Sequence, residues 1–287
     1  MTAAICILSP DPLDEGFRTR WREVLDRNAA PLRAAGLTVE YRSWAARDDL
    51  TPFALVLPLL VWGYPRAHCQ WVEAVERWRG QGVRLHNPAS VLVWNADKRY
   101  LGRLEERGAP VVPTAYAERL TSEAMEAARA RFGTDRLVAK PQVSSTAWQT
   151  IRWSPGESLD GGPEGAAMIQ PYLPAIEESG EVSLIFFGGR FSHAISKRPQ
   201  PGDFRVQPEF DGIIAAYRPA ADELQAAEHI LGAVDEDLLY ARVDLVRGLA
   251  GEPELIELEL IEPDLYLGYD PATGAAFVEA VRERIGR

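Results

Sequence analysis

Three acids and one arginine within residues 240–264 are spaced so that they share one face of a predicted β-hairpin. Two runs of alternating apolar and polar residues are joined there by a turn that contains glycine. With the turn midway between the runs, Asp244 lies opposite Glu257 and Arg242 lies opposite Glu259. Because like charges paired across strands are destabilising, a cation is expected between Asp244 and Glu257.

Carboxylate oxygens are hard ligands that suit Mg²⁺ better than zinc or copper. The pattern therefore predicts a magnesium site formed by Asp244, Glu257 and Glu259. A solvated sheet face is the alternative interpretation, but such a face usually mixes both signs, whereas three acids here face one arginine. The other face of the second run is expected to carry its apolar residues, Ile256, Leu258 and Leu260.

The composition of the chain limits its class and its partners. It has 287 residues, 46% hydrophobic, with a net charge of −11 and no basic stripe, which argues against nucleic acid and anionic membranes as partners. Cys6 and Cys69 make neither a disulfide framework nor a metal-ligand set. The start lacks the features of a signal peptide, and the longest apolar run, 53–63, is too short to span a bilayer. We expect a cytoplasmic protein.

Residues 1–94 are predicted to form a small parallel α/β domain, because strand and helix patterns alternate. The expected strands are 4–9, 37–42, 53–61 and 83–86, and the expected helices are 18–35 and 67–79. Ligands of such sheets bind beyond the carboxyl ends of the strands. Trp62, Gly63 and Tyr64 follow the third strand, so they form either a substrate contact or an aromatic turn packed on the next helix.

The rest of the chain reads as a second, mixed region of helices and antiparallel strands. Its expected helices are two short ones between 87 and 108, then 122–130, one ending near 233, and 275–284. Its expected strands are 136–141, 148–153, 166–173 and two hairpins, 181–197 and 240–264. Residues 142–148 are expected to form a polar loop, and 198–219 an irregular segment. The first hairpin should turn at Gly188 and Gly189.

Several short motifs follow one another at a characteristic spacing: NADKRYL (95–101), VAKP (138–141), MIQPYL (168–173), GEVS (180–183), AISKRPQPGDFRVQ (194–207) and the acidic hairpin. In this order they resemble the ATP-grasp superfamily, in particular its glutathione synthetase and ribosomal-protein-modifying ligase branch. The resemblance implies an α/β architecture of the ATP-grasp type. An N-terminal α/β domain (1–94) would precede an ATP-grasp domain (95–287), in which 112–172 is the smaller of two α+β lobes that grip the nucleotide.

The resemblance also assigns the nucleotide-binding residues. Lys98 and Lys140 would contact the phosphates, and the loop 142–148, with Ser144 and Ser145 where the family usually has glycines, would cover them. The adenine base would be held by the side chain of Gln170 and the backbone of Leu173, and the ribose by Glu181.

The same family implies the catalytic and metal-binding residues. Lys197 would contact phosphate, Arg205 the transferred phosphoryl group or a substrate carboxylate, and Arg242 the charge on the acyl phosphate. Asp244, Glu257 and Glu259 would hold one or two Mg²⁺, with Mn²⁺ as the alternative. ATP would then phosphorylate a carboxylate or carbonyl of a small, amino-acid-like substrate, and an amine would displace phosphate to form a carbon–nitrogen bond.

Other functions stay open at this point. The WNADKRYL run (94–101) and the ELELIEP run (257–263) also resemble the O-ureidoserine cyclo-ligases that close the cycloserine ring, in which a nitrogen of the same molecule attacks. A non-catalytic ATP-binding regulator and a small-molecule kinase are further alternatives. The sequence leaves the role of Glu262 and a homo-oligomeric state undecided.

Overall fold

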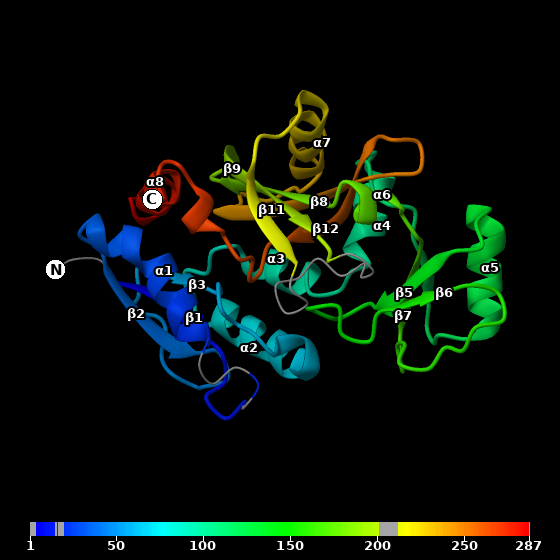
Figure 1. Ribbon diagram of the computed structural model, residues 1–287. Helices are drawn as coiled ribbons and strands as arrows, with labels where there is room; N and C mark the ends of the chain where they lie inside the picture. Colours follow the sequence, from blue (N-terminus) through cyan, green and yellow to red (C-terminus); the bar gives the residue numbers. More distant parts are fainter. Residues whose placement is uncertain (1–3, 15, 17–19, 201–211, 287) are drawn as a thin grey trace.

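Three β-sheets organise the protein in the computed structural model, which describes residues 4–14, 16, 20–200 and 212–286 (Figure 1). Along the chain, a small three-stranded N-terminal sheet is followed by a four-stranded sheet and then by a five-stranded sheet, which lies between the other two in space and is called the central sheet. None of the described helices combines the length and the apolar character needed to cross a bilayer.

The N-terminal sheet is parallel, with its first strand in the middle, as the alternating pattern predicts. Its elements are β1 (Ala4–Ser9), α1 (Arg20–Ala34), β2 (Thr38–Ser43), β3 (Leu55–Leu57), the 3₁₀ helix η2 (Tyr64–Ala67) and α2 (His68–Gly80). Buried apolar side chains of β1 and β3 face the two helices, which supply the apolar stripes that cover the sheet.

Two predicted strands of this unit are wrong in extent. The strand expected over 53–61 is confined to β3, because Pro58 has no N–H to donate to a ladder and the chain turns directly after it. The strand expected over 83–86 makes only an isolated bridge to β3. The Arg84 carbonyl and the His86 N–H bond to Val56 of β3, but the Leu85 N–H turns back to the Val83 carbonyl, so the pairing does not extend into a strand.

The central sheet is antiparallel and has the order β10–β9–β8–β11–β12. Its strands are β8 (Glu181–Phe187), β9 (Arg190–Arg198), β10 (Ile213–Tyr217), β11 (Tyr240–Arg247) and β12 (Pro253–Glu259). Gly188 and Gly189 turn the first hairpin with φ of 54° and 75°, as predicted. The segment expected to be irregular up to 219 contains β10, whose run IIAAY lacks alternation but pairs along its whole length with β9.

The third sheet has the order β4–β7–β5–β6 and carries α5 on one face. Its elements are β4 (Ala115–Ala117), α5 (Ser122–Phe132), β5 (Leu137–Pro141), β6 (Ile151–Trp153) and β7 (Ala167–Pro171). The strand expected over 148–153 is wrong in its first half. The Trp148 N–H closes a turn to Ser145, and Gln149 has a φ of 51°, which an extended strand does not permit.

The remaining helices tie the sheets together. They are α3 (Ala89–Trp94), α4 (Tyr100–Glu106), α6 (Ala175–Glu178), α7 (Ala221–Gly232), the 3₁₀ helix η4 (Leu267–Tyr269) and α8 (Ala275–Ile285). The helix α7 packs on one face of the central sheet. The last helix, α8, lies beside α1, and Phe277 joins Phe187 and Tyr240 in one core with the N-terminal unit (Figure 1). Arg242 and Asp244 follow Tyr240 on the same side of β11, so polar side chains occupy the part of this face that lies beyond the core.

Candidate active site

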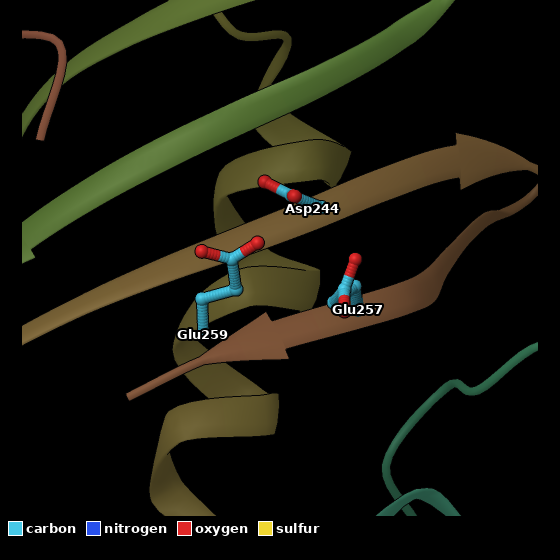
Figure 2. A group of neighbouring side chains, drawn as sticks. All are labelled: Asp244, Glu257 and Glu259. Carbon is cyan, nitrogen blue, oxygen red and sulfur yellow. The ribbon is translucent and has the colours of Figure 1, made fainter. Parts of the chain in front are cut away.

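The acidic hairpin has the predicted register. Asp244 of β11 pairs with Glu257 of β12, and Arg242 pairs with Glu259. Figure 2 shows the three carboxylates on the same side of the two strands, with a helix behind the opposite face. One oxygen atom from each acid lies within 4.8 Å of the others. Among the residues that the structure describes, this is the group of acids, histidines or cysteines that could hold a metal ion.

One face assignment is wrong, because the hairpin contains a β-bulge. The pairing shifts between Asp244 and Leu245, so that Leu245 pairs with Leu255 and Ile256 is the extra residue. Leu255 therefore takes the buried position in the core. Ile256, expected on the face of Leu258, is half-buried and lines the same cavity as Glu257. Strict alternation cannot predict this, since one inserted residue reverses the face of all that follow it.

Cross-strand neighbours extend the polar face from the hairpin to β8 and β9. Ser183 lies opposite Asp244, and its hydroxyl donates to the carboxylate Oδ1 at 2.6 Å. Lys197 lies opposite Glu181, and its ammonium group donates to Glu181 at 2.6 Å and to Asp244 Oδ2 at 3.1 Å. Arg242 donates to both oxygens of Asp244 and to Glu259. Glu181, Lys197, Asp244, Arg242 and Glu259 thus form a continuous network of alternating charges in the middle of the site.

Burial and the neighbouring charges shift the pKa values of the three acids of the hairpin. Burial alone would raise the pKa of Asp244, but Arg242 and Lys197 hold it well below its ordinary value. Burial raises the pKa of Glu259 to about 7, helped by the negative charge of Glu257 and opposed by Arg242. Burial would raise the pKa of Glu257 as well, but Lys98 lowers it.

Lys98 connects the hairpin to the loop after β5. Its ammonium group donates to Glu257 Oε1 at 2.8 Å and to the Ser144 carbonyl at 2.9 Å, and its backbone N–H bonds to Gln142 at 2.8 Å. The Ser144 hydroxyl is used inside the loop, where it donates to the Pro141 carbonyl at 3.2 Å. Lys98 therefore anchors the loop over the acids.

Two cavities meet at this network. The small cavity, of about 110 Å³, lies between the central sheet and the four-stranded sheet. All seven residues predicted to bind the nucleotide line it: Lys98, Lys140, Ser144, Ser145, Gln170, Leu173 and Glu181. Gln170 is held in place by a 2.9 Å hydrogen bond to Thr114, a partner that the motif does not indicate.

Lys140 differs from the other cations of the site. Its ammonium group makes no hydrogen bond or ion pair with another residue of the described part of the chain, and burial lowers its pKa. Its neighbours on β5, Ala139 and Pro141, are buried on the other face of the strand. Lys140 therefore faces the small cavity. An anion entering this cavity would meet a cation that is free to bind it.

The large cavity, of about 530 Å³, lies between the central sheet and the N-terminal unit. The acidic network forms one wall through Asp244, Glu257, Glu259, Arg242 and Lys197. Trp62, Gly63 and Tyr64 form another, so the position expected for them beyond β3 is the one they occupy. Arg205, the remaining predicted site residue, lies outside the described residues.

Sequence reasoning missed the residues that support the hairpin from outside. The strand β12 is an edge strand, and its backbone would be left without partners on one side. Asn95 accepts from the Leu260 N–H at 3.0 Å and donates to the Leu258 carbonyl at 2.8 Å, while the Tyr100 hydroxyl accepts from the Leu258 N–H at 2.8 Å. Both residues lie in the NADKRYL motif, which was interpreted only through Lys98.

The fold and the site together define an ATP-grasp ligase. Residues 7–87 match the family described as D-cycloserine synthetase DcsG, N-terminal domain. The cycloserine biosynthesis protein DcsG of Streptomyces lavendulae is 31% identical over 288 residues, which cover 91% of this chain and 95% of that protein. The chain therefore belongs to the D-cycloserine synthetase (DcsG) family, and it is an ATP-dependent ligase.

Solved structures agree with this assignment. The crystal structure of D-cycloserine synthetase DcsG superposes with a TM-score of 0.81 and 26% identity, covering 99% of this chain and all of that one (100%). The D-alanine–D-alanine ligase of Bacillus anthracis complexed with ATP gives a TM-score of 0.71 at 16% identity, covering 99% of both chains. At that identity the second likeness concerns the fold alone.

Proposed function

We propose that this ligase closes a ring within a single amino-acid substrate of the O-ureidoserine type. The observation that carries the proposal is that the residues matching the family line part of the active site. Residues 7–87, which match the N-terminal domain of D-cycloserine synthetase, contribute Trp62, Gly63 and Tyr64 to the wall of the large cavity. The relationship therefore includes the part of the site that faces away from the nucleotide, whereas the shared ATP-grasp fold alone would account only for the small cavity.

In this proposal the small cavity binds MgATP. Lys98 and Lys140 contact the phosphates, the loop with Ser144 and Ser145 covers them, and Gln170 and Leu173 hold the adenine. Glu181 reaches the ribose from the floor of the cavity. The division of the chain into 1–94 and 95–287, with 112–172 as the smaller lobe, belongs to the same proposal.

The acidic hairpin suits a divalent cation. Asp244, Glu257 and Glu259 offer three hard oxygen ligands within 4.8 Å of one another, and an additional positive charge would offset the burial and the repulsion that raise the pKa of Glu259. When bound, one or two Mg²⁺ would neutralise the phosphate oxygens of ATP. Arg242 and Lys197, already fixed by Asp244, would then hold the transferred group in line with the acceptor.

The proposed chemistry has two balanced steps. A substrate carboxylate oxygen attacks the γ-phosphorus of ATP and ADP leaves, which gives an acyl phosphate. A nitrogen of the same molecule then attacks the acyl carbon, phosphate leaves with the former carboxylate oxygen, and the nitrogen loses a proton. The ring product has therefore lost one water relative to the substrate. Arg242 stabilises the oxyanion that forms during the second step.

The test measures ADP and phosphate release from MgATP with O-ureidoserine alone, and with single and paired amino acids and dipeptides. We expect O-ureidoserine alone to support turnover. Mass spectrometry should then detect a product that has lost one water relative to the substrate, or a product that has lost both this water and the carbamoyl group. Turnover that requires two different substrates would replace ring closure by intermolecular amide formation. A stable phosphorylated product without phosphate release would indicate a kinase.

A further inference from the structure

Among the described residues, Glu262 and Asp264 are the acids of the large cavity that the proposed chemistry does not use. Glu262 follows β12 and lines the cavity together with Ile261 and Asp264. Its Oε2 atom is buried and has no hydrogen-bond partner among the residues that the structure describes. A buried polar atom without a partner is costly, so its position at a cavity wall indicates a ligand that pairs with it.

The cations near Glu262 are already engaged by other acids. Lys98 binds Glu257 at 2.8 Å, Arg242 binds Asp244 and Glu259, and Lys197 binds Glu181 and Asp244. Burial, followed by the negative charge of Glu259, raises the pKa of Glu262 well above its ordinary value. No cation of the described residues is therefore paired with Glu262 itself.

Tyr64 forms the neighbouring surface from the N-terminal unit. Its side chain is buried, and burial followed by the charge of Glu262 raises the pKa of its hydroxyl. Its ring packs on Trp71 at a centroid distance of 5.3 Å, and Gly63, with a φ of 88°, turns the chain so that Tyr64 enters the cavity wall. A carboxylate beside an aromatic ring is a favourable environment for an organic cation.

We infer that Glu262, with the ring of Tyr64 beside it, binds the α-ammonium group of the substrate and makes the enzyme select α-amino acids over plain carboxylic acids. The inference rests on the proposed function, because it places the substrate in the large cavity. Held by its ammonium group at Glu262, the substrate presents its carboxylate to Arg242 and the acidic hairpin, which line the same cavity. Glu262 acts here as a specificity-determining residue that contacts the substrate but takes no part in bond formation.

The experiment compares two substrates that differ only in the ammonium group, O-ureidoserine and 3-(ureidooxy)propionate, in wild type and in Glu262→Gln. For the wild type we expect kcat/KM to fall about 10- to 100-fold when the ammonium group is absent, as for the loss of a charge-assisted hydrogen bond. In Glu262→Gln the two substrates should differ by no more than a few-fold, chiefly through a raised KM for the amino acid. The KM for ATP should stay unchanged.

Asp264→Asn is the matched control. Asp264 lines the same cavity two residues further on, but its Oδ1 already accepts the Tyr266 N–H at 2.9 Å. This variant should discriminate between the two substrates as the wild type does. Glu262→Asp, which retains the charge, should keep part of the discrimination and provides a second variant if Glu262→Gln fails to fold.

Three outcomes would overturn the inference. They are undiminished discrimination in Glu262→Gln, an equal loss of kcat with both substrates, and a wild type that accepts both substrates equally. If O-ureidoserine itself is not turned over, ring closure fails as a proposal, and the same comparison is made with whichever amino acid of the panel is active and its des-amino analogue. Turnover of des-amino acids alone would overturn the ammonium site whatever the reaction.

Discussion

The small and the large cavity meet at the same acidic hairpin, but each has one ionisable group without a partner in the described residues, and one group is basic whereas the other is acidic. At the small cavity this group is Lys140, and at the large cavity it is Glu262. Between them, Lys98, Lys197 and Arg242 are paired with acids. Buried charges are normally paired, so the two exceptions indicate where ligands of the complementary charge bind.

This difference separates two kinds of residue in one site. The paired residues in the middle hold one another in position, so a change in any of them should affect every reaction of the enzyme. The two unpaired residues should each affect one ligand, ATP for Lys140 and the amino-acid substrate for Glu262. Variants can test this separation directly.

The largest effect is expected for Glu257→Gln, in the shared middle. The change removes a predicted metal ligand and the partner of Lys98, so kcat with any substrate should fall about 10²- to 10³-fold. Its side chain is about one-third exposed (34%), so the fold should persist, as circular dichroism would show. Glu254→Gln on the same strand is the control, because Glu254 lies outside both cavities. Normal turnover in Glu257→Gln would contradict the assignment of the acids as metal ligands.

An intermediate effect is expected for Lys140→Met, which removes the unpaired cation and keeps a similar apolar stem. Affinity for MgATP, measured by calorimetry, should weaken about 10- to 100-fold, because a charged contact to phosphate is lost. The preference for the substrate with an ammonium group should stay as in the wild type, the reverse of the result expected for Glu262→Gln. Unchanged nucleotide affinity would remove Lys140 from the site and with it one half of the comparison.

The smallest effect on catalysis is expected from the support of β12. Asn95→Ala leaves the Leu260 N–H and the Leu258 carbonyl without their partner, so the free energy of unfolding should drop by about 2 kcal/mol. Urea titration would measure this change. Asn28→Ala, a buried asparagine of α1 whose Nδ2 has no partner among the described residues, is the control and should lose less. Equal losses would mean that Asn95 only fills space.

Much of the site could be predicted from the residue pattern, because strand pairing is local. Alternation along β11 and β12 put Arg242, Asp244, Glu257 and Glu259 on one face, and the turn set their register, which the structure confirms. The order of the motifs brought seven residues to one cavity, where the structure places them. Their roles toward ATP and metal stay predictions.

Other features depend on contacts between segments that are far apart in the chain. The bulge at Ile256 brings this side chain to the wall of the small cavity, and alternation alone could not reveal it. Asn95 and Tyr100 complete the edge of a strand more than 150 residues away, with sequence separations of 165 and 158. Tyr64 follows a strand of the N-terminal sheet and Glu262 follows β12, and both line the large cavity only because the N-terminal sheet and its helices pack on the central sheet. Local pattern specifies each element and its polar face, whereas the shape and the charge balance of the cavities arise only when the sheets are packed together.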